Sequence, residues 1–304
     1  MASRCWRKTY SRNHGRKPNR RSKRSRCWND LVIRILVIGC ASLDTLRLSD
    51  GQTHYTIGGA GLYTALAAAR VGAETILLAP KPQPLPEQFS LAANRLQWIG
   101  PLVSPDDLPR LEIQHHGGGR ATLLAAAWGA EAQLTPAALD DDLSGYGVIH
   151  IAALSSASRQ LGFLRACRKR GAPCVSAGTY AKIVRAEPGT VRALFAEANY
   201  FFMNKNEAAN LFESWDEARP APGNLLFITD GKYGLTIRSG RYEEHVIAEK
   251  ASELDPTGAG DAFCGATLAA LAGGDDPAGA ADIGAQWAAR VVESVGPAAL
   301  LIDR

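Results

Sequence analysis

Short apolar segments alternate with Ala-rich segments of helical composition along most of this chain. Apolar runs of this kind are typical of strands buried on both faces of a mainly parallel sheet. We expect strands at Leu31–Gly39, Thr75–Ala79, Val148–Ala153, Cys174–Ser176, Tyr200–Met203 and Leu225–Thr229. We expect helices at Gly61–Val71, Leu91–Gly100, Arg159–Arg170, Thr190–Ala198, Glu207–Phe212 and Ala262–Leu271, with one more helix at the C-terminus. The alternation predicts an α/β fold: a doubly wound, mainly parallel sheet sandwiched by helices.

Two segments depart from this alternation. Leu46–Thr56 contains a Ser-Asp-Gly turn, and Leu111–Ala127 places two polar-apolar strands on either side of three consecutive glycines. Both patterns predict antiparallel ribbon, and Leu235–Ile247 predicts a hairpin. We therefore expect a small β structure, built from about 46–56 and 111–127, beside the main sheet.

Composition favours one main domain and a reducing compartment. The chain has 304 residues, 46% of them hydrophobic, which is enough for one large core. Its six cysteines are dispersed without a Cys-x-x-Cys pair or a secretory signal, so we predict no disulfide framework and no zinc site. No apolar run long enough to span a membrane occurs. A cytoplasmic enzyme fits these features.

Positive charge is concentrated at the N-terminus. Residues 1–30 carry 11 Lys/Arg against one acid, Asp30, and the remaining chain has a net charge near −6. Residues 1–30 have few apolar residues to bury, so we predict a basic disordered extension preceding a domain over residues 31–304. Two interpretations stay open: a start site assigned too far upstream, or a tail that contacts nucleic acid or anionic lipid.

The most informative motif is the sequence DPTGAGDAF at Asp255–Phe263. A Gly-Ala-Gly turn that opens a helix leaves the backbone N–H groups of Gly258, Ala259 and Gly260 at the positive end of the helix dipole. Such a turn binds phosphate, and Asp261 places a carboxylate beside it. The combination indicates a general base next to a phosphoryl group.

At these residues the chain resembles the ribokinase-like (PfkB) carbohydrate kinases, whose C-terminal signature is similar. Further segments follow in the family's order: IGGAGLYTALAAARVGAET at Ile57–Thr75, NKNE at Asn204–Glu207 and ITDGKYG at Ile228–Gly234. The resemblance runs from about Leu31 to the C-terminus. It implies ATP as phosphoryl donor, Mg²⁺ as cofactor, a β lid over the acceptor and a homodimer formed through that lid.

The resemblance assigns the reacting centre to the glycine turn. It makes Asp261 the base toward the acceptor hydroxyl and Gly258, Ala259 and Gly260 the anion hole for the transferred group. Asp255 is expected either to position a Mg²⁺-bound water or the phosphate chain, or to cap the loop. The Thr257 hydroxyl has equal claims to a structural and a ligand-binding role.

The donor end is expected around two further motifs. Asn204 and Glu207 lie one helical turn apart, which suits Mg²⁺ held indirectly through water, while a plain helix cap is the alternative. Thr229, Gly231 and Gly234 are expected along the nucleotide, with Lys232 either meeting a phosphate or solvated. Asp230 departs from the family's usual small or apolar residue, so the nucleotide edge differs here.

The acceptor end is expected after the first strand. Asp44 follows it at the carboxyl edge of the sheet, where a carboxylate can accept two hydroxyls, and Gly58 and Gly59 allow the backbone to approach the same ligand. Tyr63 replaces an Asn that the family often uses, which weakens a ribose-specific interpretation. Two interpretations are open for His115 and His116: one of them faces the acceptor while the other faces away, or both are solvated.

The sequence thus predicts an ATP-dependent kinase acting on a hydroxyl of a small sugar, polyol or nucleoside. Dinucleotide binding at Gly58–Gly61 is disfavoured because the spacing of the glycines fails and Ala79 stands where an acid would be needed. A binding or regulatory protein that kept the fold without turnover stays open as an alternative. Salt-dependent DNA affinity that disappears on deletion of residues 1–30 would favour that alternative.

Overall fold

The computed structural model describes residues 33–302. The basic extension predicted for residues 1–30 lies outside the described residues.

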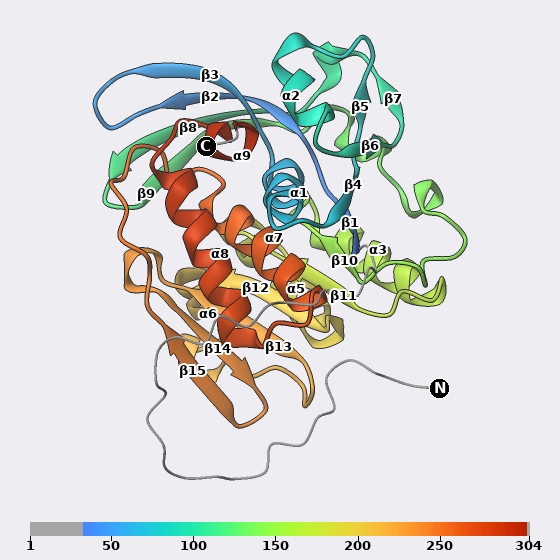
Figure 1. The fold of residues 1–304 in the computed structure, drawn as a ribbon, viewed down its shortest axis with the longest axis vertical. Helices are drawn as coiled ribbons and strands as arrows, with labels where there is room; N and C mark the ends of the chain where they lie inside the picture. The colour runs from blue at the N-terminus through green and yellow to red at the C-terminus, as the bar shows by residue number, and fades with distance from the viewer. Residues whose placement is uncertain (1–32, 303–304) are drawn as a thin grey trace.

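A mainly parallel sheet forms the centre of the molecule (Figure 1). Over the described range it has nine strands, in the order β15-β14-β13-β12-β11-β10-β1-β4-β6. The strands from β13 to β6 are parallel, and β14 and β15 extend the sheet as an antiparallel hairpin. Their bounds are β1 Arg34–Ile38, β4 Glu74–Leu78, β6 Gln97–Ile99, β10 Val148–Ile151, β11 Val175–Gly178, β12 Tyr200–Asn204, β13 Leu225–Thr229, β14 Leu235–Ser239 and β15 Tyr242–Val246. The predicted doubly wound α/β architecture is confirmed.

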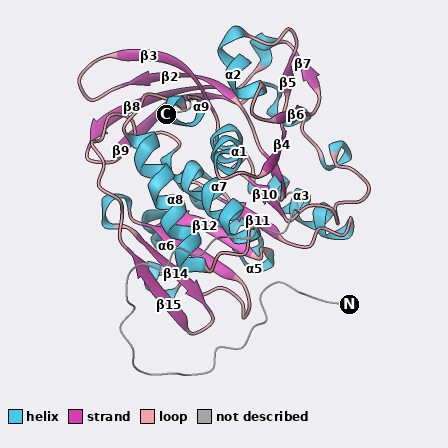
Figure 2. Ribbon diagram, viewed as in Figure 1, coloured by secondary structure: helices cyan, strands magenta, loops and turns pink. Residues whose placement is uncertain are grey.

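Helices cover both faces of this sheet and create two apolar cores (Figure 2). One face carries α1 Ala60–Arg70, α7 Ala259–Ala272, α8 Pro277–Val292 and α9 Ala298–Leu301. The other carries α3 Ala157–Lys169, α4 Ala181–Ala186, α5 Pro188–Glu197 and α6 Lys205–Leu211. Alternate residues of β1 serve the two cores: Ile35 and Val37 face the first, Leu36 and Ile38 the second. This explains why β1 is apolar at consecutive positions.

A second sheet covers one end of the α/β body and is called the lid below. It consists of β2 Ser42–Arg47, β3 Thr53–Gly58, β8 Arg110–Gly117 and β9 Arg120–Ala127, in the order β3-β2-β8-β9. Figure 1 shows it close to α1 and α9. The β8–β9 hairpin turns at three glycines that all have positive φ: Gly117, Gly118 and Gly119. Both segments predicted as antiparallel ribbon thus contribute to this sheet.

The helix predicted at Leu91–Gly100 is wrong over most of its length. Only Ser90–Ala93 is helical (α2), and Gln97–Ile99 forms the edge strand β6, paired with β4. Trp98 decides this arrangement: its ring packs 5.3 Å from that of Phe89, and its indole N–H donates to the Ala79 carbonyl at 3.3 Å. The hydrogen bonds that β4 offers at its open edge outweigh the local helical preference.

Smaller elements complete the described chain. Strands β5 Lys81–Pro82 and β7 Leu102–Val103 form a two-stranded pair. Short 3₁₀ turns occupy Glu87–Phe89, Pro105–Asp107, Gly129–Gln133, Pro136–Ala138, Trp215–Glu217 and Gly231–Tyr233. Among residues 33–302, no helix is both long and apolar enough to cross a membrane. The cysteines of this range are all buried: Cys40, Cys167, Cys174 and Cys264.

Candidate active site

A cavity of about 310 Å³ lies where the carboxyl ends of the parallel strands meet the lid and the N-terminus of α7. Sequence-predicted residues that line it are Asp44, Gly59, Tyr63, Asn204, Glu207, Thr229, Thr257, Gly258, Gly260 and Asp261. The sequence-predicted residues that are not part of the lining include Gly58, Gly231, Gly234, Asp255 and Ala259. Five segments that are far apart in sequence therefore meet at one site, as expected at the carboxyl edge of an open α/β sheet.

The glycine turn before α7 has the backbone of an anion site. Gly258 caps the helix with φ 75° and ψ 0°, a left-handed conformation that glycine adopts without strain. A Cβ at Gly258 would lie 2.4 Å from carbons of the Tyr63 ring, so the turn also requires glycine for packing. Nothing would obstruct a Cβ at Gly260, which is exposed toward the cavity. The Ala259 N–H is partly engaged by the Pro256 carbonyl, at 3.3 Å.

Asp261 lies in the first turn of α7, directly after this turn, and lines the cavity. Burial raises the pKa of its carboxyl to about 7. A carboxyl with this pKa is about half ionised near neutral pH, which is the condition for efficient general-base catalysis. The position and the protonation range both suit proton abstraction beside the anion turn.

Asp255 fixes the turn through hydrogen bonds to the backbone. Its side chain is fully buried, and its carboxylate accepts hydrogen bonds from the Thr257 N–H at 2.9 Å and the Gly296 N–H at 2.7 Å. His115 of the lid approaches the same carboxylate at 3.2 Å. Both oxygens thus have protein partners, the arrangement of a loop-capping aspartate.

The opposite end of the cavity carries unpartnered polar atoms. Asp44 is 3% exposed on β2, and its Oδ1 has no hydrogen-bond partner within residues 33–302. Burial raises the pKa of Asp44 to about 7. The buried hydroxyl of Tyr63 also lacks a partner in the described part of the chain, and both residues line the cavity. A buried polar atom without a partner is costly, so these atoms indicate where a ligand hydroxyl binds.

Two glycines allow Asp44 and the β2–β3 ribbon to approach α1. A Cβ at Gly58 would lie 1.9 Å from Asp44 Oδ2, and Gly59 has φ 100° with the Cys40 carbonyl 2.5 Å from its Cβ position. Any side chain at Gly58 would displace the Asp44 carboxylate. Both glycines therefore matter because the absence of a side chain lets neighbouring groups pack closely against their backbone.

The lid side of the cavity is apolar and aromatic, a feature that sequence reasoning missed. Its residues are Leu111, Ile113, Leu123, Trp128 and Tyr180. The rings of Trp128 and Tyr180 have centroids 6.2 Å apart, although more than 50 positions separate them in sequence. No motif links the two residues. The only usable signals were that Trp128 follows the predicted ribbon and that Tyr180 follows a parallel strand.

At the carboxyl end of β12, Asn204 and Glu207 form a capping box for α6. The Asn204 side chain accepts from the Glu207 N–H at 2.9 Å, and Glu207 accepts from the Asn204 backbone N–H at 2.9 Å. Glu207 is 6% exposed; burial, with a contribution from the charge of Asp261, raises its pKa to about 8. The cap therefore fixes an acid in the cavity wall close to Asp261.

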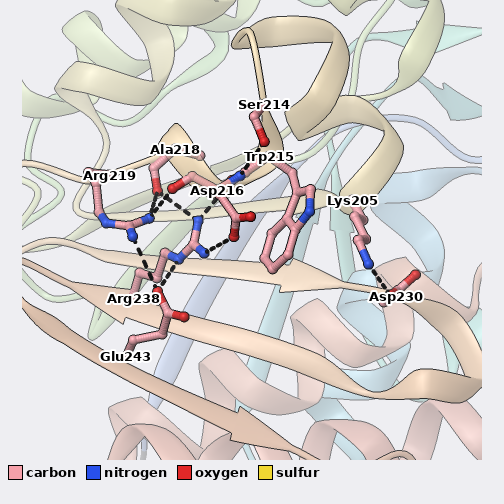
Figure 3. Close-up of polar contacts among 9 residues, drawn as sticks. All are labelled: Lys205, Ser214, Trp215, Asp216, Ala218, Arg219, Asp230, Arg238 and Glu243. Carbon is pink, nitrogen blue, oxygen red and sulfur yellow. Dashed lines mark hydrogen bonds and ion pairs between the residues drawn. The ribbon is translucent and has the colours of Figure 1, made fainter.

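Asp230 is paired with a cation at the rim of this end. Lys205 Nζ lies 2.9 Å from Asp230 Oδ2 and 4.8 Å from the centre of the Trp215 ring (Figure 3). Thr229 lines the cavity next to Asp230, and Gly231 and Gly234 shape the following turn. Gly234 has φ 96°, and a Cβ there would lie 2.1 Å from the Val246 carbonyl oxygen. Lys232 instead lies over the ring of Tyr233.

Trp215 is itself supported by a buried arginine. The Arg238 guanidinium stacks 4.9 Å from the centre of the Trp215 ring and donates to the Trp215 carbonyl at 2.8 Å. It also pairs with Asp216 at 3.2 Å and with Glu243 at 2.8 Å (Figure 3). Sequence reasoning did not identify Arg238. The buried charge of Arg238 has both carboxylate and carbonyl partners, so Arg238 holds the Trp215 ring in place next to Lys205.

The cavity is rich in acids and poor in cations. Its lining among the described residues includes no Lys or Arg, whereas Asp44, Glu207 and Asp261 all line it. The described residues contain no cluster of three or more His, Cys, Asp or Glu able to hold a metal alone. This donor set suits Mg²⁺, which keeps several waters and is shared with the phosphates of a nucleotide.

Comparison with known proteins agrees with this geometry. The family model described as "pfkB family carbohydrate kinase" matches residues 33–304. A cytidine kinase from Thermococcus kodakarensis is 25% identical over 252 residues, covering 80% of this chain and 90% of the relative. A ribokinase from Bacillus subtilis is 26% identical over 267 residues, covering 80% and 87%. The crystal structure of adenosine kinase from Sinorhizobium meliloti superposes with a TM-score of 0.74 at 18% identity, covering 87% of this chain and 95% of that one.

Proposed function

The chain belongs to the pfkB family of carbohydrate kinases, and on this premise we propose that it transfers the γ-phosphoryl group of ATP to a hydroxyl of a nucleoside. One observation carries the proposal: a single cavity joins a glycine turn with Asp261 at one end to unpartnered hydroxyl-binding groups, Asp44 and Tyr63, at the other. The charges of Asp255, Asp44 and Asp261 all act on Tyr63 and, after burial, raise its pKa well above the usual value.

In the proposed reaction Asp261 removes the proton from the acceptor hydroxyl. The electron pair left on the acceptor oxygen forms a bond to the γ-phosphorus. At the same time the bond from that phosphorus to the β–γ bridging oxygen breaks, and ADP leaves. The N–H groups of the turn at Gly258–Gly260 bind the charge on the transferred group. Asp44 accepts hydroxyls of the acceptor and fixes its orientation.

Mg²⁺ would be held through water near Asn204 and Glu207, and when bound it would neutralise phosphate charge. Asn204 and Glu207 both line the cavity. Burial keeps the pKa of Glu207 near 8 in the absence of a cation. A bound cation would favour the ionised form of Glu207.

The apolar lid side favours a nucleoside over a free sugar. In the set Trp128, Tyr180, Leu111 and Ile113, a row of sugar hydroxyls would find two polar groups, the Trp128 indole N–H and the Tyr180 hydroxyl. A base attached to the ribose would pack against these groups, whereas ribose alone would leave them in water. Stacking of a base on an aromatic side chain contributes about 1–3 kcal/mol. The cytidine kinase and adenosine kinase among the similar proteins are in keeping with this choice.

An acceptor panel tests the proposal. ADP release from Mg-ATP is measured with cytidine, adenosine, inosine and ribose, and the phosphorylated product is identified by mass. We expect kcat/KM for the best nucleoside to exceed that for ribose by roughly 10- to 100-fold. Trp128→Ala should remove most of that advantage and leave the value for ribose unchanged. Turnover of ribose alone, or of no acceptor, would contradict the proposal.

A further inference from the structure

His115 links the lid to the anion turn. It lies on β8, is 2% exposed, and places Nε2 3.0 Å from Thr257 Oγ1 and 3.2 Å from Asp255 Oδ1. Asp255 and Thr257 belong to the segment that leads into Gly258 and α7. Its neighbour His116 is exposed and hydrogen-bonds to Thr122 Oγ1 of the adjacent lid strand, at 2.9 Å. The two adjacent histidines thus have different surroundings.

The partners of His115 define which ring nitrogen carries the proton. An ionised carboxylate can only accept, so Nε2–H is the donor toward Asp255, and the Thr257 oxygen shares it. Nδ1 is buried without a hydrogen-bond partner in residues 33–302. A proton on Nδ1 would leave a buried donor unpaired, so the neutral Nε2–H form fits this site. Burial lowers the pKa of His115, although the charges of Asp255 and Glu253 oppose the shift, and a lowered pKa also favours the neutral ring.

The same strand also forms part of the cavity wall. Leu111 and Ile113 line the cavity, and His115 is the next residue on that side of β8. An acceptor that packs against Leu111 and Ile113 therefore sets the position of the strand that holds His115. A second contact joins the lid to the same segment, because Glu253 accepts from the Gly119 N–H at the hairpin tip, at 2.8 Å.

We propose that His115 is a positioning residue: its imidazole transmits the seating of the lid on an acceptor to the turn that binds the transferred phosphoryl group. The inference rests on the proposed kinase function. It follows that the acceptor and the nucleotide bind cooperatively and that this cooperativity depends on the Nε2–H contact. A residue that merely fills space at this position would affect stability without coupling the two sites.

The test measures the affinity of Mg-AMP-PNP by calorimetry, without and with a saturating amount of the nucleoside that has the highest kcat/KM in the panel. For the wild-type protein we expect the nucleoside to tighten nucleotide binding at least fivefold. His115→Leu, which keeps the volume and removes the donor, should bring this ratio close to 1. His115→Gln keeps an N–H at similar reach and should restore part of it, and His116→Leu is the matched control that should behave as wild type.

Kinetics give a second readout. His115→Leu should lower kcat by roughly 10- to 100-fold and raise KM for the nucleoside, since a displaced turn misaligns the reacting groups. Thr257→Val removes the same contact from the other side and should reproduce the loss of coupling if His115→Leu does not fold.

A wild-type ratio near 1, or a ratio that His115→Leu and Thr257→Val leave at the wild-type value while turnover persists, would overturn the inference alone. A wild-type protein that phosphorylates no nucleoside would overturn the proposed function and, with it, this inference.

Discussion

At the scale of single residues, the site depends on acids whose charged form is disfavoured by their surroundings. Asp44 and Asp261 both have pKa values raised to about 7 by burial, and no Lys or Arg among the described residues lines their cavity. Perturbed carboxyls of this kind collect at functional sites because substrate and cation supply the missing partners. The ligand-free protein therefore carries the free-energy cost of removing these carboxylates from water.

The first prediction concerns pH. Asp261 acts as base only when ionised, so kcat/KM for the acceptor should rise with pH through about 7 and level off above about 8. Below the midpoint its fall should approach tenfold per pH unit, and it should be steeper if Asp44 must also be ionised. Initial rates at saturating Mg-ATP between pH 5.5 and 9 measure the profile. A flat profile between pH 5.5 and 7 would contradict the assignment of Asp261.

Several of these residues were predictable and others were not, for a physical reason. Asp261 and the Gly258–Gly260 turn belong to one continuous motif, whose chemistry can be deduced from its own spacing. Trp128 and Tyr180 come together only through the fold. In the case of His115 and His116, strand alternation predicted that only one faces inward, but only the structure shows that His115 does and that it contacts Thr257.

At the scale of elements, several residues of the candidate site lie at the end of a strand or at the start of a helix. Thr229 ends β13, Asn204 ends β12 and begins α6, and Asp261 lies in the first turn of α7. Buried strands of continuous apolar sequence were predicted accurately because these apolar runs are shorter than a buried helix. Strand β6 was not, since its three residues are strand only by pairing with β4.

The second prediction concerns the strand-end pair Lys205–Asp230. Both side chains are partly exposed, so the pair itself adds little stability, but Lys205 neutralises a carboxylate at the donor rim. Lys205→Met should raise KM for ATP by roughly 3- to 10-fold through repulsion of the donor phosphates. Asp230→Asn alone should leave that KM unchanged or lower it, and the double variant should return close to wild type. If Lys205→Met and the double variant have the same KM for ATP, Lys205 does not act by neutralising Asp230.

At the scale of the whole molecule, two apolar cores on the faces of the central sheet stabilise a site that is itself destabilising. The acids of the cavity lie between the α/β body and the lid, where burial disfavours their charge. The overall architecture followed from the alternation of elements in the sequence. The cavity did not, because it depends on how far the lid closes over the carboxyl edge of the sheet.

The third prediction follows from linkage. The folded-state pKa of Asp44, about 7, lies above its unfolded value, so its protonated form is favoured in the fold and stability is lost as pH rises from about 4 to 7. Asp44→Asn should raise the free energy of unfolding of the ligand-free protein at pH 8 by about 1–3 kcal/mol. The gain should shrink as pH falls to 5. Urea denaturation at both pH values measures it.

The control for this prediction is Asp106→Asn. The Asp106 side chain is 96% exposed, and its substitution should change stability by no more than about 0.5 kcal/mol at either pH. A loss of stability in Asp44→Asn at pH 8 would show that the Asp44 carboxylate is stabilised by contacts in the ligand-free protein.

The central claim is that Asp261 is the base in a phosphoryl transfer beside the Gly258–Gly260 turn. The most direct test is acceptor-dependent ADP release at pH 8 by the wild-type protein and by Asp261→Asn, with the best nucleoside of the panel and saturating Mg-ATP. We predict that kcat falls by about 10² or more in the variant, while KM for the nucleoside changes by less than about threefold. Turnover of Asp261→Asn within a few-fold of wild type would contradict the account.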